Sequence, residues 1–269
     1  MTSPSGPIIG VFDSGFGGLT VLRALLPLVP GAHYVYLGDT ARLPYGSKSR
    51  ETIARYAVES AMYLESKGAE MLVIACNTAT ALALGDITSA ISIPLAGVID
   101  PVVRAAEQRH PSATVLVLAT SATVQSHAYL QHCRDHGLHA IEKACPLLVP
   151  LVEEGWTDHP VTRDVLRIYL SEALAVCTPQ AVLLGCTHYP LIAPAITSVL
   201  RELGSSAEVI DSAEATALAV TQPFSGETAS TVAATFECFA TDSVEKFARL
   251  GSHFLGQPIP KVELLDLGG

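Results

Sequence analysis

The sequence predicts an α/β protein made of two similar lobes, each with a mostly parallel β-sheet covered by helices. Apolar runs alternate with segments of helical spacing, which is typical of parallel sheets with helical crossovers. This alternation restarts after Asp100. A weak internal repeat is also present, because Cys76 follows Asp13 by 63 residues and Cys186 follows Thr120 by 66. The repeat suggests that strand ends of the two lobes face each other.

The first half of the chain contains four apolar runs that we predict to be strands. Each run ends in polar or turn-forming residues, and the segments between them have helical spacing or a high alanine content. Asp13, Ser14 and a Gly-Phe-Gly-Gly turn follow the first run, and Pro101 follows the fourth. The predicted strands are residues 8–12, 33–37, 71–76 and 93–100, and the predicted helices are residues 19–26, 53–64 and 79–84.

The second half repeats the pattern, and its tail is expected to return to the first lobe because the second lobe already has its strands. We expect Ser212 to cap one helix and Asp242 with Glu245 to begin another. The predicted strands are residues 113–119, 138–142, 182–186, 208–211, 231–240 and 262–265, with one helix that ends near residue 137 and another over 162–177. The first lobe is therefore predicted to contain residues 1–97 and 211–269, and the second lobe residues 98–210.

Composition and charge argue against several classes of protein. The 269-residue chain is 49% hydrophobic and 16% charged, with a formal charge of −10. A nucleic-acid surface needs clustered Lys and Arg, so none is expected. The segment before Arg23 lacks the features of a secretion signal, and the longest uncharged run, residues 111–133, is too polar for a lipid-facing helix. We expect a cytoplasmic protein without membrane contact.

No motif for a cofactor or a metal is evident. The six cysteines show no C-x-x-C spacing, and Cys133, Cys145, Cys177 and Cys238 are expected to be buried or incidental. The glycines after Asp13 do not match a dinucleotide fingerprint, and a phosphate-binding P-loop is also missing from the sequence. We therefore expect a reaction that needs neither metal nor cofactor.

Two cysteines stand out because each follows an apolar strand. Cys76 ends the run Met-Leu-Val-Ile-Ala-Cys-Asn-Thr, and Cys186 ends Val-Leu-Leu-Gly-Cys-Thr-His-Tyr-Pro. Either one alone could be an ordinary small buried side chain. Ligands of parallel α/β sheets bind beyond the carboxyl ends of strands, however, and a following helix N-terminus is expected to lower a thiol pKa. Together the two sites favour a function.

Other candidates lie at neighbouring strand ends and turns. Asp13 with Ser14 could be only a helix cap, and Pro44-Tyr45-Gly46 only a turn. The functional interpretation places Asp13 opposite a cationic amine and uses backbone N–H groups of the turn to cradle a carboxylate. His188 could be structural, but two residues from a thiol it is placed to carry a proton. The further candidates, each with an ordinary structural alternative, are Asn77, Thr78, Thr120, Thr123, Glu153 and Thr187.

Two opposed thiols suit the inversion of a carbon centre. A thiolate on one side removes a proton, a thiol on the other side returns one, and the roles exchange for the opposite enantiomer. The carbanion beside a carboxylate is unstable, so hydroxyl and amide donors would be needed around it.

Six motifs in order resemble those of glutamate racemases, which belong to the cofactor-independent aspartate/glutamate racemase superfamily. These motifs are Asp-Ser-Gly-Phe-Gly-Gly, Leu-Pro-Tyr-Gly, Ala-Cys-Asn-Thr-Ala-Thr, Ala-Thr-Ser-Ala-Thr-Val, Pro-Leu-Val-Glu-Glu-Gly and Gly-Cys-Thr-His-Tyr-Pro. The resemblance covers residues 8 to about 215. It implies two pseudo-symmetric three-layer lobes with the active site in the cleft between them. It also implies interconversion of L- and D-glutamate, supply of D-glutamate for peptidoglycan, and a homodimer.

The same resemblance implies roles for individual residues. Cys76 and Cys186 would be the acid/base pair, with Asp13 and His188 as their catalytic neighbours and as contacts to the substrate ammonium. The side-chain carboxylate would be held by Ser14, Pro44, Tyr45 and Gly46, and the α-amino and α-carboxylate groups by Asn77, Thr78, Thr120 and Thr187. Many relatives have Gly-Thr where this chain has Ala119-Thr120, and the hydroxyl is kept.

Three alternative functions stay open at the level of sequence. An aspartate or hydantoin racemase would differ in the size of the pocket near Tyr45. A thiol hydrolase would use Cys186 as nucleophile and His188 as base, and would leave Cys76 without a role. A non-catalytic binding module would exchange no protons with solvent.

Overall fold

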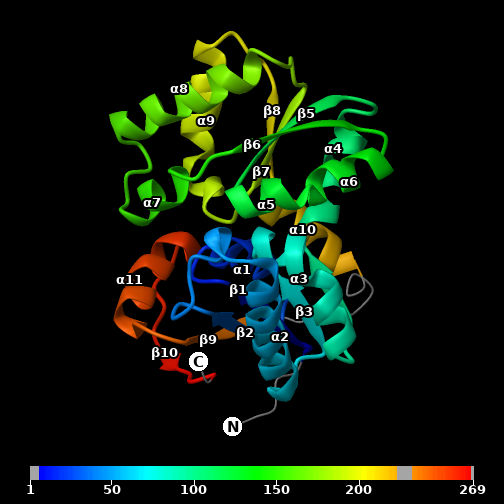
Figure 1. The fold of residues 1–269 in the computed structure, drawn as a ribbon. Helices are drawn as coiled ribbons and strands as arrows, with labels where there is room; N and C mark the ends of the chain where they lie inside the picture. The colour runs from blue at the N-terminus through cyan, green and yellow to red at the C-terminus, as the bar shows by residue number, and fades with distance from the viewer. Residues whose placement is uncertain (1–5, 223–231, 268–269) are drawn as a thin grey trace.

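Two parallel β-sheets organise the computed structural model, which describes residues 6–222 and 232–267. The lower lobe in Figure 1 contains a six-stranded sheet in the order β10-β9-β2-β1-β3-β4, and the upper lobe a four-stranded sheet in the order β6-β5-β7-β8. Every strand pairing is parallel. The predicted α/β class with parallel sheets is confirmed.

The first sheet is built from both ends of the chain. Its strands are β1 (Ile8–Asp13), β2 (His33–Gly38), β3 (Met71–Ile74), β4 (Leu95–Gly97), β9 (Thr235–Ala240) and β10 (Val262–Leu264). One face packs against α1 (Leu19–Leu25), α10 (Ser212–Thr221) and α11 (Val244–Leu255), and the other against α2 (Arg50–Ser66) and α3 (Asn77–Ala90). β9 pairs with β2, so the predicted return of the tail to the first lobe is confirmed.

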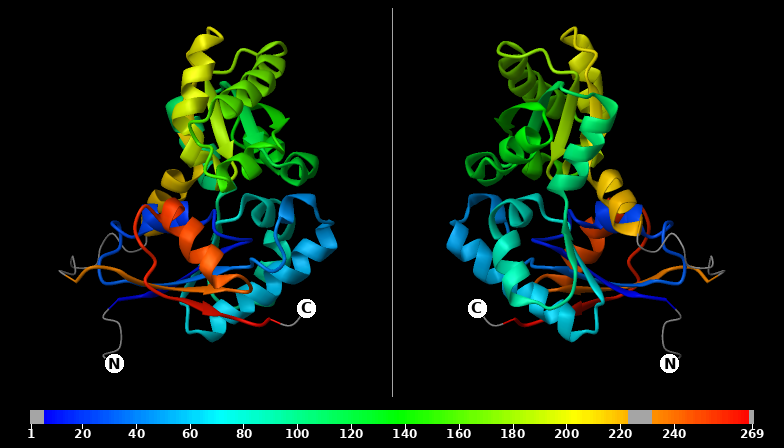
Figure 2. Two further views of the ribbon diagram at one scale, coloured as in Figure 1. Left: turned by 90° about the vertical axis from the view of Figure 1, so that its left-hand side faces the viewer. Right: turned by 90° about the vertical axis from the view of Figure 1, so that its right-hand side faces the viewer.

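The second sheet carries β5 (Thr114–Ala119), β6 (His139–Ala144), β7 (Ala181–Gly185) and β8 (Glu208–Asp211). The helices α4 (Ile99–Arg109) and α6 (Ala128–Asp135) cover one face, and α7 (Leu148–Glu153), α8 (Pro160–Leu174) and α9 (Ala193–Glu202) the other. Figure 2 shows the lobes stacked, with the strands of this sheet running toward the first lobe. Strand membership supports the proposed lobe boundaries near residues 97 and 211, which stay a prediction.

Burial on both faces explains why the central strands read as continuous apolar runs. All five residues of β7 are buried, and so are five of the six residues of β1 and of β5. Strands in parallel sheets are covered by helices on both sides, so they lack the polar alternation of half-exposed strands. The sequence signal that located the cysteine-bearing segments therefore comes from their central place in each sheet.

Several predicted boundaries were wrong. The predicted helix ending near residue 137 is two helices, α5 (Ser121–Ser126) and α6, because His127 between them is left-handed with φ 56°. The predicted strand over 93–100 is confined to β4, and Pro101 lies inside the first turn of α4, a position where its missing N–H costs no helical hydrogen bond.

The predicted helix caps also differ from the observed ones. Asp211 rather than Ser212 caps α10, by accepting a hydrogen bond from the N–H of Ala213. At the start of α11 the cap position is Ser243, and the Asp242 carboxylate accepts a hydrogen bond from the N–H of that neighbour. Residue 231, the predicted beginning of the strand that became β9, lies outside the described residues.

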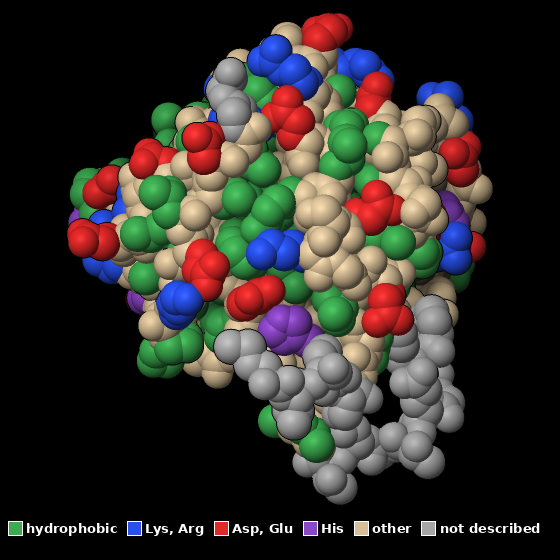
Figure 3. Space-filling model, turned by 90° about the horizontal axis from the view of Figure 1, so that it is seen from below, with side chains coloured by type: hydrophobic (Ala, Val, Ile, Leu, Met, Phe, Trp, Pro, Cys, Tyr) green, Lys and Arg blue, Asp and Glu red, His purple; other side chains and the backbone are tan. Residues whose placement is uncertain are grey.

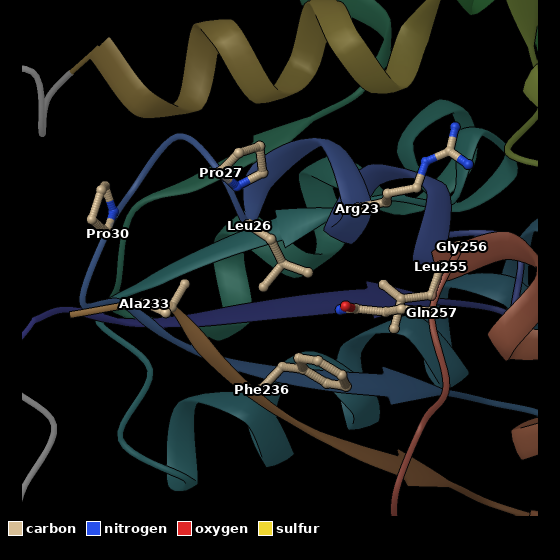
Figure 4. A pocket seen from close by; sticks show the side chains of 10 residues that line it. Arg23, Leu26, Pro27, Pro30, Ala233, Phe236, Leu255, Gly256 and Gln257 are labelled. Carbon is tan, nitrogen blue, oxygen red and sulfur yellow. The ribbon is translucent and has the colours of Figure 1, made fainter. Parts of the chain in front are cut away.

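The surface of the described chain is mixed in charge. The underside of the first lobe in Figure 3 shows acidic, basic and hydrophobic side chains interspersed. Among residues 6–222 and 232–267, no helix is both long and apolar enough to cross a membrane. A hollow of about 570 Å³ beside α1 and β9 is lined by residues such as Leu26, Phe236 and Leu255 (Figure 4). The described residues that line it include none of the predicted site residues.

Candidate active site

The predicted site residues gather where the second lobe meets the first. A Cβ atom added at Gly17, in the turn after β1, would lie 2.3 Å from Thr187 Oγ1 and 2.6 Å from His188 Nδ1. The Thr20 hydroxyl donates to the carbonyl of Thr187 across the same boundary. The segment after β1 and the segment after β7 are therefore in direct contact.

Cys76 forms the N-cap of α3, two residues beyond the end of β3. Its sulfur accepts a hydrogen bond from the N–H of Ala79 at 3.4 Å and lies 3.5 Å from Ser14 Oγ. Burial raises the pKa of the Cys76 thiol to about 12, and the charge of Asp13 adds to the rise. The hydrogen bonds with Ser14 and with the N–H of Ala79 at the helix N-terminus lower the pKa, as expected, but by less than burial raises it, so the expected net lowering was wrong for this residue.

Cys186 lies beside His188 in the second lobe, and His188 in turn pairs with Glu153. Its sulfur is 3.9 Å from Nδ1 of His188, whose Nε2 is 3.2 Å from Oε1 of Glu153. Burial alone would lower the pKa of His188, but its hydrogen bonds to Cys186 and Glu153, together with their charges, raise it to about 10. Glu153 thus lies against His188, and its part in binding a substrate stays a prediction.

Aromatic rings fix the place of this histidine. The ring of Phe254, from α11, meets the His188 ring edge-on at a centroid distance of 5.0 Å, and Phe16 lies 6.2 Å away. Both phenylalanines belong to segments of the first lobe, so the first lobe packs against the His188 ring of the second. Sequence reasoning missed both residues, because single phenylalanines in apolar segments look like ordinary core.

Asp13 is a buried carboxylate with one oxygen available. Its Oδ2 accepts from the N–H of Gly15 at 2.9 Å, and within the described parts of the chain Oδ1 has no hydrogen-bond partner. Burial raises the pKa of Asp13, and the charge of His188 opposes the rise. A cationic group beside Oδ1 would satisfy this oxygen.

Three threonine hydroxyls join the lobes. Thr78 Oγ1, at the start of α3, is 3.1 Å from Thr120 Oγ1 and 3.2 Å from Thr123 Oγ1, and the latter two are 2.9 Å apart. Each hydroxyl can donate or accept, so the cluster can rearrange around an anionic ligand. Thr187 belongs to the other side of the site, with its hydroxyl 3.4 Å from His188 Nδ1.

Asn77 presents an amide that is only half satisfied. Its Oδ1 accepts a hydrogen bond from the Tyr129 hydroxyl at 2.7 Å, whereas its Nδ2 is buried without a partner among the described residues. Sequence reasoning missed Tyr129, which belongs to none of the six motifs.

The Pro44-Tyr45-Gly46 turn approaches the threonine cluster through its backbone. The Tyr45 hydroxyl donates to Asp39 Oδ2 at 2.6 Å and is buried away from solvent. A Cβ atom at Gly46 would lie 3.1 Å from Cβ of Thr120. The turn therefore lies against the threonine cluster, and the Tyr45 side chain anchors it to the first lobe. The use of its main-chain N–H groups as a carboxylate cradle stays a prediction.

The arrangement combines ionisable side chains with hydrogen-bond donors. Cys76 with Asp13, and Cys186 with His188, form two thiol sites on opposite lobes. No group of His, Cys, Asp and Glu suited to a metal occurs in the described ranges 6–222 and 232–267. Buried donors at Asn77 and the threonines lie around the site, where a carboxylate could use them.

Known racemases are similar to this protein over nearly the whole chain. The family model described as Asp/Glu/Hydantoin racemase matches residues 9–220. A glutamate racemase of Koribacter versatilis is 50% identical, covering 98% of each chain, and one of Geobacter metallireducens is 40% identical, covering 96% of each. The crystal structure of a Francisella tularensis glutamate racemase in complex with D-glutamate superposes with a TM-score of 0.86 at 33% identity, covering 97% of this chain and 98% of that one.

Two more solved structures share the fold of this chain but differ in sequence identity to it. The glutamate racemase from Thermus thermophilus in complex with β-chloro-D-alanine has a TM-score of 0.86 and 40% identity, covering 99% of each chain. An aspartate racemase of Picrophilus torridus has a TM-score of 0.60 and 21% identity, covering 84% of this chain and 96% of that one, which shows a shared fold only. The chain belongs to the Asp/Glu/Hydantoin racemase family.

Proposed function

We propose that this chain interconverts L- and D-glutamate by proton transfer at Cα between two thiols, without a cofactor. The observation that carries the proposal is the pair of buried cysteines on strand ends of opposite lobes, each beside its own acid/base neighbour. The glutamate racemases at up to 50% identity over almost the full length support glutamate as substrate.

The proton balance needs one thiolate and one thiol at the start of each turnover. The thiolate takes the Cα proton and becomes a thiol, while the opposite thiol gives its proton to the other face of Cα and becomes a thiolate. Solvent exchange then resets the pair. Because Cys76 has a raised pKa, it is protonated in the ligand-free protein at neutral pH. The positive charge of a nearby substrate ammonium would lower this pKa and favour ionisation of the thiol.

We assign the substrate contacts from the unpartnered groups. The free Oδ1 of Asp13 receives the ammonium, and the free Nδ2 of Asn77 donates to the α-carboxylate, where negative charge develops. Thr78, Thr120, Thr123 and Thr187 complete the shell around the α-amino and α-carboxylate groups. Ser14 and the backbone of Pro44-Tyr45-Gly46 would hold the side-chain carboxylate.

The wider cellular role and the assembly are also part of the proposal. D-Glutamate made here would supply peptidoglycan, the cell-wall polymer, and the reaction would take place in the cytoplasm. We propose a homodimer, which light scattering during size-exclusion chromatography would report as twice the 28.2 kDa mass of the chain.

Two other activities predict different results. Sequence identity favours glutamate over aspartate, since the aspartate racemase structure is only 21% identical. A thiol hydrolase relying on Cys186 would tolerate loss of Cys76. It would also leave no role for Cys76, which is buried against Ser14 at the same lobe boundary.

The proposal is tested by incubating the protein with L-glutamate in heavy water without added cofactor. We expect loss of optical rotation and incorporation of deuterium at Cα. Both should vanish in Cys76→Ala and in Cys186→Ala, while Cys177→Ala, a substitution in a half-buried cysteine away from the site, should keep full activity. Full turnover in either active-site variant would overturn the two-base assignment, and turnover of aspartate in place of glutamate would overturn the substrate.

A further inference from the structure

We propose that Tyr129 is a positioning residue that fixes the Asn77 amide for substrate binding and spaces the two cysteine-bearing segments. The inference rests on the proposed racemisation of glutamate. Tyr129 itself does not contact the substrate in this scheme and acts through Asn77.

The hydrogen bond between these residues determines which end of the amide is available. The Tyr129 hydroxyl donates to Asn77 Oδ1 at 2.7 Å, and both side chains are buried. With its oxygen occupied, the amide can present only its NH₂ group, and Nδ2 has no partner among the described residues. A rotated amide would instead present oxygen, which repels a carboxylate. The hydroxyl therefore selects the orientation that suits an anionic ligand.

The ring of the same tyrosine packs against the other cysteine segment. A Cβ atom at Gly185 would lie 3.1 Å from Tyr129 Cε2, so a larger residue there would crowd the ring. Gly185 directly precedes Cys186, and Asn77 directly follows Cys76. The Tyr129 side chain thus contacts a residue next to each cysteine in the sequence, Asn77 in the first lobe and Gly185 in the second.

Local structure explains how Tyr129 reaches this position. It is the second residue of α6, just after the left-handed residue His127 that separates α5 from α6. The Ser126 hydroxyl accepts from the N–H of Ala128 at 3.2 Å and stabilises the break. A single continuous helix would place residue 129 on a different face relative to α5, so the break serves to direct the tyrosine toward the lobe boundary.

The hydroxyl can act as a donor throughout the working range of pH. Burial holds the pKa of Tyr129 well above its ordinary value, and the charges of Cys133, Cys186 and Glu142 add to the effect. Ionisation of Cys186 during turnover therefore makes the tyrosine harder to deprotonate, and the orientation of Asn77 is kept.

The test is a double-mutant cycle with Tyr129→Phe and Asn77→Ala. Tyr129→Phe keeps the ring and removes only the hydroxyl, and we expect kcat/KM for glutamate to fall about tenfold, the size of effect typical for one buried hydrogen bond. In the Asn77→Ala background the same substitution should change kcat/KM by less than about twofold, because the group through which the hydroxyl acts is gone. A general structural role would instead lower kcat/KM by the same factor in both backgrounds.

A matched control is Tyr34→Phe, which also removes a buried hydroxyl donor, here to the carbonyl of Leu25 in the first lobe. We expect this variant to lose some resistance to urea but to keep kcat/KM. A second readout needs no tyrosine variant: the side-chain NH₂ resonances of Asn77, identified by their loss in Asn77→Ala, should shift on addition of D-glutamate.

The outcomes separate this inference from the proposed function. A wild-type protein that does not racemise glutamate would overturn the function itself. A wild-type protein that does so while Tyr129→Phe is fully active, or is equally impaired with and without Asn77, would overturn the positioning role alone. Asn77 side-chain resonances that do not shift on addition of D-glutamate would also overturn the positioning role.

Discussion

At the scale of single residues, the ionisation of the two thiol sites is governed by burial and by neighbouring charge. A helix N-terminus and a hydroxyl favour the Cys76 thiolate, but removal of the sulfur from water outweighs them and raises the pKa to about 12. His188 shows the opposite balance, because its interactions with Cys186 and Glu153 overcome the effect of burial. The free protein thus keeps a protonated thiol on one lobe and a cationic imidazole on the other.

Alkylation should report the protonated thiol directly. Only the thiolate reacts with iodoacetamide, so modification of Cys76 should be slow at pH 7.5 and rise about tenfold per pH unit until the pH approaches the pKa. Peptide mapping by mass spectrometry would follow this cysteine separately from the other five. A rate that levels off near pH 8 would contradict the raised pKa.

Glu153 should set the pH range over which His188 stays charged. The imidazolium is present below its raised pKa, and Glu153→Gln removes an anionic partner, so the pKa should fall from about 10 toward the ordinary value of 6.5. We expect the alkaline loss of kcat to move to lower pH, together with the histidine titration followed by NMR. Unchanged profiles would mean that Glu153 does not control this proton.

At the scale of elements, the close approach of the turn after β1 to the segment after β7 leaves no room for a side chain at residue 17. Gly17→Ala would place a methyl group within 2.3 Å of Thr187 Oγ1, so one segment must move. We expect kcat/KM to fall by on the order of 100-fold, since misplacement of about 1 Å has effects of that size. Steady-state kinetics with circular dichroism would separate this loss from unfolding.

Gly85→Ala provides the matched glycine control. Gly85 lies within α3, where an added Cβ meets no atom within 4 Å, and alanine is favoured over glycine inside a helix by about 0.5–1 kcal/mol. We expect a slightly more stable protein with unchanged kinetics. If Gly17→Ala were as active as Gly85→Ala, the lobe contact would not constrain catalysis.

The elements also show what sequence reasoning can and cannot reach. The strands before Cys76 and Cys186 were predictable because burial on both faces leaves a continuous apolar run. The break at His127 was not, since it depends on one left-handed residue that is neither glycine nor proline and therefore carries no strong turn signal. Tyr129 was unpredictable for the same reason, because its role depends on where that break directs it.

At the scale of the whole molecule, buried thiols tie stability to pH. Burial raises the pKa values of Cys76, Cys133, Cys145 and Cys238 from an ordinary 9.0 to about 12. Between these values the unfolded chain binds fewer protons than the native protein, so the free energy of unfolding falls as pH rises. This stabilisation is fully present below about pH 9 and is lost toward pH 12, by at most about 1.4 kcal/mol per pH unit for each thiol.

Urea midpoints measured from pH 7.5 to 10.5 would check this dependence. We expect a gradual fall from pH 7.5, because the raised pKa of His188 also favours the native protein below about pH 10, and a steeper fall above about pH 9 where the thiols begin to ionise. The steeper part should be shallower in Cys238→Ala, which removes one of the four buried thiols and leaves both candidate catalytic cysteines in place. A midpoint that stays flat to pH 10.5 would show that the buried cysteines do not titrate as the structure implies.

The two lobes together make the central claim, in which one thiol serves each face of Cα. Its most direct test is the distribution of deuterium at early times, when L-glutamate reacts in heavy water and both enantiomers are separated before analysis by mass spectrometry. With one thiol on each face, the D-glutamate formed should carry deuterium while the remaining L-glutamate keeps its hydrogen. Product that retains the original hydrogen, or substrate that gains deuterium as fast as product forms, would contradict the account.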